Sequence, residues 1–141
     1  MLVKKFKEYI KEGVVKERTS EFLRASSLIS EAKKRKAFLE EIYWKIGISE
    51  SSSNYFIEMS YDIIMELLRA KMLKEGYSSQ SHEAEVSYML KIGFQEADAM
   101  YMDKVRYFRN GIIYYGKSPE IDYAIKVMKF TEKVFNTLSR V

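Results

Sequence analysis

The segment SSNYFIEMSYDIIMELLRAKMLK, residues 52–74, predicts the central helix of an all-helical fold. Its apolar side chains recur at steps of three and four residues, and they do so along two sides of the helix. One row comprises Phe56, Met59, Ile63, Leu67 and Ala70, and the other comprises Ile57, Ile64 and Leu68. A helix that is apolar on two sides belongs in the middle of a helical bundle. Gly76 follows the segment and predicts its end, because glycine commonly terminates helices.

The neighbouring segments show the same rhythm of three and four residues. Residues 22–46 carry one apolar stripe, made of Phe22, Ala25, Ile29, Ala32, Leu39, Tyr43 and Ile46. A short helix is expected over 82–92, and longer ones over 95–115 and 121–138. Ser118, Pro119 and Glu120 predict the start of the last helix, with a capping hydroxyl, a proline at the first helical position and an acid in the first turn.

These elements predict an all-α, antiparallel up-and-down four-helix bundle with one or two short extra helices. We expect one domain over residues 1–141, because the chain has the length of a typical single domain and 47% of its residues are apolar. Residues 1–18 are expected to form a loosely packed arm or a short helix, and residues 77–81 a loop.

The composition excludes several classes of site. The chain has no cysteine and its one histidine is His82, so thiolate chemistry, disulfides and multi-histidine metal sites are excluded, and no metal or cofactor is expected. No apolar run approaches the roughly 18 residues that span a bilayer, and the N-terminus does not resemble a signal peptide, so we expect a cytoplasmic protein without membrane contact. The net charge of +4 is compatible with nucleic-acid contact but does not establish it.

The densest group of candidate functional residues lies between Arg106 and Gly116. Arg106, Arg109 and Asn110 share one helical face, and Tyr114 lies beside them. Two guanidinium groups, an amide and a phenol together suit a phosphate or a carboxylate, because arginine presents a planar fork of donors. The alternative is structural: Asp103, three residues before Arg106, predicts an ordinary surface ion pair.

Two further features have both a functional and a structural interpretation. His82 stands behind serines at the start of a short helix, where it is either a catalytic group or a structural side chain. The basic run Lys33-Lys34-Arg35-Lys36 is typical of a solvated helix face, and contact with RNA is the alternative.

Three blocks of the sequence, taken in order, form a recognisable pattern: residues 61–70 (YDIIMELLRA), 76–84 (GYSSQSHEA) and 109–116 (RNGIIYYG). Together they resemble the HEPN superfamily, a group of small helical nucleotide-binding domains. The resemblance implies a bundle of four or five helices, usually a homodimer, in which polar motifs of both subunits meet. It also implies one of two activities: metal-independent RNA cleavage, often by the toxin of a toxin–antitoxin pair, or binding of nucleotides, RNA or a minimal nucleotidyltransferase partner.

The motif of the RNA-cleaving members is an arginine, usually followed by a polar residue, with a histidine five to seven positions after the arginine. Arg109 and Asn110 match its first half, whereas Tyr114, Tyr115 and Gly116 occupy the histidine positions. A tyrosine of ordinary pKa, about 10, is protonated at neutral pH and is a poor base. The resemblance therefore favours binding over catalysis.

Three hypotheses follow from the sequence. The first is a catalytically weak or inactive HEPN-like protein that binds a nucleotide, RNA or a nucleotidyltransferase through Arg106, Arg109, Asn110, Tyr114 and Tyr115. The second is a metal-independent RNA endonuclease of a toxin–antitoxin pair, in which Arg109 holds phosphate and Tyr114 or His82 transfers the proton. The third is a structural assembly module whose arginines form interface ion pairs.

Overall fold

The computed structural model describes residues 3–115 and 120–139, and in the first stretch it describes side chains up to residue 111. The described elements, in chain order, are α1 (Phe6–Lys11), β1 (Val15–Glu17), α2 (Phe22–Lys45), α3 (Ser53–Glu75), β2 (Tyr77–Ser79), α4 (His82–Lys91), α5 (Glu96–Tyr115) and α6 (Ile121–Leu138). The predicted all-α class is confirmed. The predicted capping residues Ser118 and Pro119 lie outside the described residues, but Glu120, which was predicted for the first turn, is the extended N-cap residue, and α6 begins only at Ile121.

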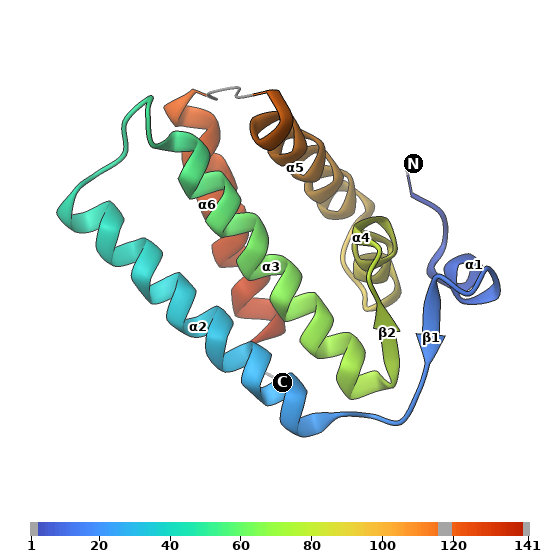
Figure 1. Cartoon of the computed structure of the whole chain (residues 1–141). Coiled ribbons are helices and arrows are strands. Elements are labelled where there is room, and N and C mark those ends of the chain that lie inside the picture. The colour runs from blue at the N-terminus through green and yellow to red at the C-terminus, as the bar shows by residue number, and fades with distance from the viewer. Residues whose placement is uncertain (1–2, 116–119, 140–141) are drawn as a thin grey trace.

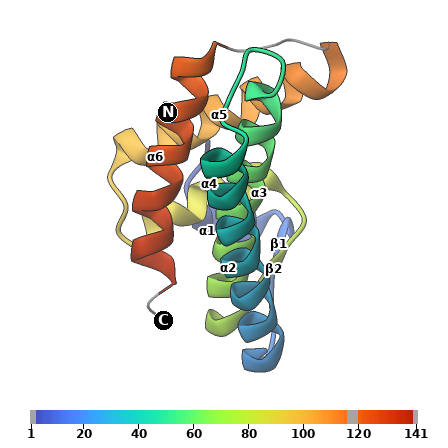
Figure 2. The same cartoon turned by 90° about the vertical axis from the view of Figure 1, so that its left-hand side faces the viewer.

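Four long helices, α2, α3, α5 and α6, run alternately up and down, with α3 in the middle (Figure 1). Helix α3 packs against α2, α4, α5 and α6. Both apolar rows of α3 are buried, as in Ile57, Ile63, Ile64 and Leu68, none of which is exposed to solvent. Figure 2 shows α2 and α6 from the side. The side of α3 left uncovered carries polar residues and forms the floor of the site described below.

The stripe of α2 is buried only in its middle. Ala25, Ile29, Ala32 and Leu39 lie against the core. The outer members of the predicted stripe are different: Phe22, Tyr43 and Ile46 are 62%, 38% and 82% exposed. The prediction that Phe22 and Ile46 belong to the packed stripe was therefore wrong, whereas the Tyr43 ring, although partly exposed, still packs edge-on against Phe56 of α3 at a centroid distance of 6.2 Å. Periodicity identifies the side of a helix that can be buried, whereas the position of the neighbouring helix decides how much of it is covered.

The N-terminal segment is packed rather than loose. Phe6 and Tyr9 of α1 are 5% exposed, and the Phe6 ring contacts the rings of Tyr77 and Tyr88 at centroid distances of 5.2 and 5.0 Å. Strand β1 pairs antiparallel with β2, Val15 opposite Ser79. The segment predicted as the loop 77–81 thus begins with a strand. Its partner lies about sixty residues away in the chain, so local pattern does not reveal the pairing.

Gly76 joins α3 to β2 in a conformation that favours glycine. Its φ is +86°, and a Cβ atom at this position would lie 2.7 Å from the carbonyl oxygen of Arg18. The same close approach lets the backbone N–H of Arg18 donate to the carbonyl of Gly76 at 2.8 Å. The strand pair and the end of α3 therefore both depend on the absence of a side chain here.

We expect Gly76→Ala to lower the free energy of unfolding by about 3 kcal/mol, since left-handed strain of about 1–2 kcal/mol adds to a clash with backbone. Gly47→Ala is the matched control, because Gly47 has a φ of +82° and no atom within 4 Å of the added Cβ. In this control, the free energy of unfolding should fall only by the left-handed strain. Urea denaturation of both variants measures the difference, and equal losses would contradict the role given to the Arg18 contact.

Candidate functional site

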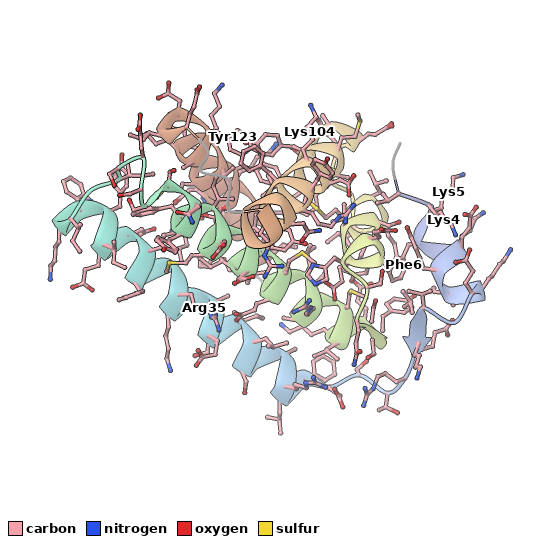
Figure 3. The ribbon with its side chains drawn as sticks, turned by 45° about the horizontal axis from the view of Figure 1, so that its top comes forward. Lys4, Lys5, Phe6, Arg35, Lys104 and Tyr123 are labelled. Atoms are coloured by element: carbon pink, nitrogen blue, oxygen red, sulfur yellow. The ribbon has the colours of Figure 1, made fainter. Side chains whose placement is uncertain are left out.

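A polar hollow of about 300 Å³ opens on the uncovered side of α3. Helices α2, α3, α4 and α5 all contribute to it. The residues that line it are Arg35, Asp62, Met65, Glu66, Arg69, His82 and Arg109. Figure 3 labels Arg35 on α2. In that view Lys104 and Tyr123 lie across α5 from Arg35. The lining carries three guanidinium groups and two carboxylates, so it is positive by one charge when His82 is neutral.

The floor of the hollow follows directly from helical spacing. Asp62, Glu66 and Arg69 are four and three residues apart, which places them on one face of α3. The other faces of α3 are buried against neighbouring helices. These three polar side chains therefore occupy the side that the bundle leaves open to solvent.

Arg109 reaches the hollow from α5 and has donor capacity to spare. Its guanidinium lies over the ring of Tyr61, 5.3 Å from the centroid, and its Nη2 lies 3.5 Å from Oδ1 of Asp62. Its Nε is buried and makes no hydrogen bond within the described part of the chain. A buried donor without a partner is unfavourable, and an acceptor on a ligand would satisfy it.

The other two arginines are held by carboxylates. Arg69 Nε donates to Oε1 of Glu85 at 2.8 Å, and Glu85 is completely buried. Burial raises the pKa of Glu85, and the contact with Arg69 opposes that increase. Arg35 Nε lies 2.8 Å from Oε1 of Glu66. These contacts fix the side chains by one edge, so each guanidinium keeps its Nη donors available for other acceptors.

His82 lies at the start of α4, where Ser81 caps the helix by accepting from the N–H of Ala84 at 3.2 Å. The Nδ1 atom of His82 is 2.7 Å from the hydroxyl of Tyr61, and the two rings stack at 12°. Burial, followed by the charges of Arg69, Arg109 and Arg106, lowers the pKa of His82. Burial also raises the pKa of Tyr61. At neutral pH the site therefore contains a neutral imidazole, held in place by a protonated phenol.

The structure brings together two of the site residues predicted from the sequence, Arg109 and His82. Asn110 is half-buried on α5 and does not line this hollow. The side chains of Tyr114 and Tyr115 lie outside the described residues, although both belong to α5.

Arg106 is directed to another surface. Its Nη2 lies 2.8 Å from Oδ1 of Asp103, so the predicted pair forms, but Asp103 is only 3% exposed and the pair is not an ordinary surface one. Arg106 instead lines a hollow beside α6 with Tyr107, Phe108 and Tyr123. It affects the first hollow through its charge rather than by contact.

Sequence reasoning missed Arg69, Tyr61 and the two acids of the floor as site residues, and it included Arg35 only as one member of the basic run 33–36, for which RNA contact was the alternative. The signal for the floor was present, because Asp62, Glu66 and Arg69 recur at helical spacing beside the two apolar rows of the helix. No comparable signal existed for Arg35, which lies within a run of four basic residues. All four side chains of this run are basic, so the sequence does not show which of them faces α3. The packing of α2 against α3 decides that.

No group of three or more acidic or histidine side chains in the described ranges 3–111 and 120–139 has the geometry of a metal site. Among the helices that are described, none is long and apolar enough to cross a membrane. The chain has no significant match to a protein-family model, a curated protein or a solved structure.

Proposed function

We propose that the chain binds a phosphate-bearing ligand, a nucleotide or an RNA strand, in the hollow formed by Arg35, Arg69, Arg109 and His82. One observation carries the proposal: three guanidinium groups from three helices converge on one solvent-open hollow, and a buried donor of Arg109 has no partner among the described residues. Guanidinium groups bind phosphate oxygens through paired, charge-assisted hydrogen bonds.

The carboxylates around the hollow are consistent with this role. Glu85 and Glu66 each engage one edge of an arginine, which orders the guanidinium before a ligand arrives. When Glu85 is counted, three carboxylates balance the three guanidinium groups, so directed donors rather than net charge would set the position of an anion. The resemblance of residues 61–70, 76–84 and 109–116 to the HEPN superfamily supports the same ligand class.

The direct test is a titration of the full chain against a fluorescein-labelled single-stranded RNA, followed by anisotropy, with AMP, ATP and inorganic phosphate as competitors. Saturable binding that phosphate-bearing competitors displace is expected. Binding should weaken with salt, because phosphate contacts release counterions. Absence of saturable binding to the RNA and to both nucleotides would refute the proposal. It would leave a nucleotidyltransferase partner, or a structural assembly role, as the function to pursue.

A second candidate function is metal-independent RNA cleavage, and the shared hollow of His82 and Arg109 favours it. In the required tautomer, His82 Nδ1–H donates to Tyr61 and Nε2 accepts the proton of a ribose 2′-hydroxyl. The 2′-oxygen then attacks the adjacent phosphorus, the bond to the 5′-oxygen breaks, and that oxygen takes up a proton from water, while His82 later returns its proton to solvent. Arg109 would hold the phosphate. In this candidate, His82 of α4 takes the role of the histidine that is absent from the motif positions after Arg109.

Under this second candidate, His82→Asn is expected to slow cleavage of labelled RNA in EDTA by about 10²–10⁴-fold, the range of general-base catalysis. Asparagine keeps a polar side chain near Tyr61 but cannot take a proton at neutral pH. Growth arrest on expression of the wild-type chain, relieved in the variant, would identify a toxin. Intact RNA after incubation with the wild-type chain would eliminate cleavage and leave the binding proposal standing.

A further inference from the structure

The face of α2 opposite the core presents an unusual set of exposed residues. Leu23, Ser30, Ala37 and Trp44 are spaced by seven residues and so form one stripe along the helix. All four are exposed, and the two large ones, Leu23 and Trp44, are 88% and 86% exposed. The buried residues of α2 lie on its opposite side. The stripe therefore makes no contribution to the core of its own chain.

A seven-residue repeat is the pattern of a helix that packs along a second helix. The middle of this stripe is small, at Ser30 and Ala37, and its ends are large. Small residues let two helices approach closely, and a large side chain needs a small one opposite it. These features favour a partner helix that runs antiparallel, because the tryptophan of each helix then meets the serine of the other.

We infer that a second copy of this chain binds the exposed face of α2, with the two α2 helices antiparallel and a two-fold axis at Ala37. In this register Ala37 faces Ala37 of the second copy. Trp44 faces Ser30 of the second copy, seven residues to either side of the axis. Each copy thus buries the other's tryptophan, and burial of a large aromatic ring is a major source of interface stability. The inference does not depend on the proposed function.

The charges beside the stripe select this arrangement. Lys33 and Lys34 precede Ala37, and Glu40 and Glu41 follow it, all four exposed. Around an axis at Ala37, Lys33 faces Glu41 and Lys34 faces Glu40 of the second copy. A parallel pair in register would place each lysine against its own counterpart, and an axis between residues 33 and 34 would place Lys33 against Lys34 of the second copy. Of these three arrangements, the one with its axis at Ala37 places opposite charges together in both halves of the interface.

Among the described residues, the partners of these acids lie on α2 itself. Glu41 Oε1 contacts Lys45 at 2.7 Å, and Glu40 Oε1 contacts Lys36, in both cases one turn away on α2. The basic side is also exposed: Lys34 lies 3.7 Å from Glu31, with 74% of its side chain accessible. Exposed pairs of this kind contribute little to folding. They can therefore be rearranged across an interface at small cost.

The proposed dimer leaves the polar hollow open. Arg35 lies two residues before Ala37, which turns it roughly 160° around the helix from the stripe. It faces α3 and the hollow instead. The two hollows of a dimer built on α2 therefore do not meet at the interface, in contrast to the arrangement that the family resemblance implies.

Reversal of charge tests the interface. Sedimentation equilibrium of the wild-type chain should show a dimer. The measurement covers roughly 1–100 μM, a concentration range in which a protein interface of standard size is expected to remain associated. Lys33→Glu with Lys34→Glu in one chain, and Glu40→Lys with Glu41→Lys in another, should each give monomers. An equimolar mixture of the two variants should form a heterodimer, because each lysine then faces a glutamate at all four positions. Formation of dimers in the mixture would also show that both variants are folded.

A second measurement uses Trp44, the single tryptophan of the chain. Its fluorescence should shift to shorter wavelength as the wild-type dimer forms. Trp44→Ser should weaken dimerisation at least tenfold, whereas Tyr107→Ser, which removes a 75% exposed aromatic from α5, should not. A wild-type chain that is monomeric at 100 μM (a concentration far above the dissociation constants of stable interfaces) would overturn the inference. So would dimers that survive both charge reversals.

Discussion

Replacement of Arg109 with alanine is expected to weaken binding of single-stranded RNA by about ten- to a hundredfold, the range for hydrogen bonds to charged groups. Arg109 contributes the one guanidinium of the hollow whose Nε is buried without a partner in the described chain, and its pair with Asp62 is long, at 3.5 Å. Its donors are therefore the least committed to other protein groups. A phosphate oxygen that accepts from these donors would make charge-assisted hydrogen bonds with them.

Two control variants separate this role from a general loss of charge. Lys104→Ala removes one positive charge from the same helix, at an exposed position that does not line the hollow, and should change the affinity less than twofold (a shift of about 0.4 kcal/mol). Arg109→Lys keeps the charge but loses the planar fork, and its affinity should lie between wild type and alanine. Thermal unfolding of all three variants checks that the fold is intact. If Lys104→Ala and Arg109→Ala weaken binding equally, binding is nonspecific and the assignment of this hollow is wrong.

Replacement of Arg69 with methionine is expected to lower the free energy of unfolding by about 3–5 kcal/mol at pH 8. Glu85 is completely buried, and the contact with Arg69 at 2.8 Å is its ion pair. Methionine preserves most of the aliphatic packing of Arg69 but leaves the carboxylate of Glu85 without a cation. An uncompensated charge in the interior is among the most unfavourable changes that a single substitution can cause.

The pH dependence of this loss identifies its origin. Burial already raises the pKa of Glu85 in the wild-type chain, and removal of Arg69, which opposes that increase, raises it further. A carboxyl group whose pKa is raised by folding favours the native state when protonated, and this stability is lost as the pH rises through the folded-state pKa. The difference between wild type and variant should therefore be full at pH 8 and shrink toward pH 4.

The double variant Arg69→Met with Glu85→Gln provides the control for this prediction. Glutamine has nearly the same volume as glutamate but no charge, so the double variant should regain most of the stability at pH 8, and its difference from wild type should depend less on pH than that of Arg69→Met. Urea denaturation at several pH values measures all three chains. A loss below about 1 kcal/mol for Arg69→Met at pH 8, the size of an exposed ion pair, would contradict a structural role for the buried pair.

Most of the fold was predictable from local pattern. The rows of α3, the stop at Gly76 and the boundaries of α4 and α5 follow from periodicity, from glycine and from capping serines. The strand pair β1–β2 was not predictable, because its two three-residue segments have no alternation long enough to recognise and they pair across about sixty residues. The exposed ends of the α2 stripe were also missed, since the extent of burial depends on where α3 and α6 lie.

The candidate site, too, was only partly predictable from the sequence. Sequence singled out Arg106 and Arg109 together, because they are three residues apart on one helix. In the folded chain Asp103 engages Arg106, whereas Arg109 extends over Tyr61 into the hollow. Spacing fixes the direction in which a side chain leaves its helix. It does not fix which groups of other helices lie within reach.

The sequence by itself determined the helices, their order and the class of bundle, because each depends on interactions between residues a few positions apart. Tertiary structure decided which polar side chains meet. Arg35, Arg69, His82 and Arg109 are spread over more than seventy residues, and the packing of α2, α4 and α5 around α3 brings them to one hollow of about 300 Å³. The energy of such a cluster depends on distances and burial across helices, and these exist only once the core has formed.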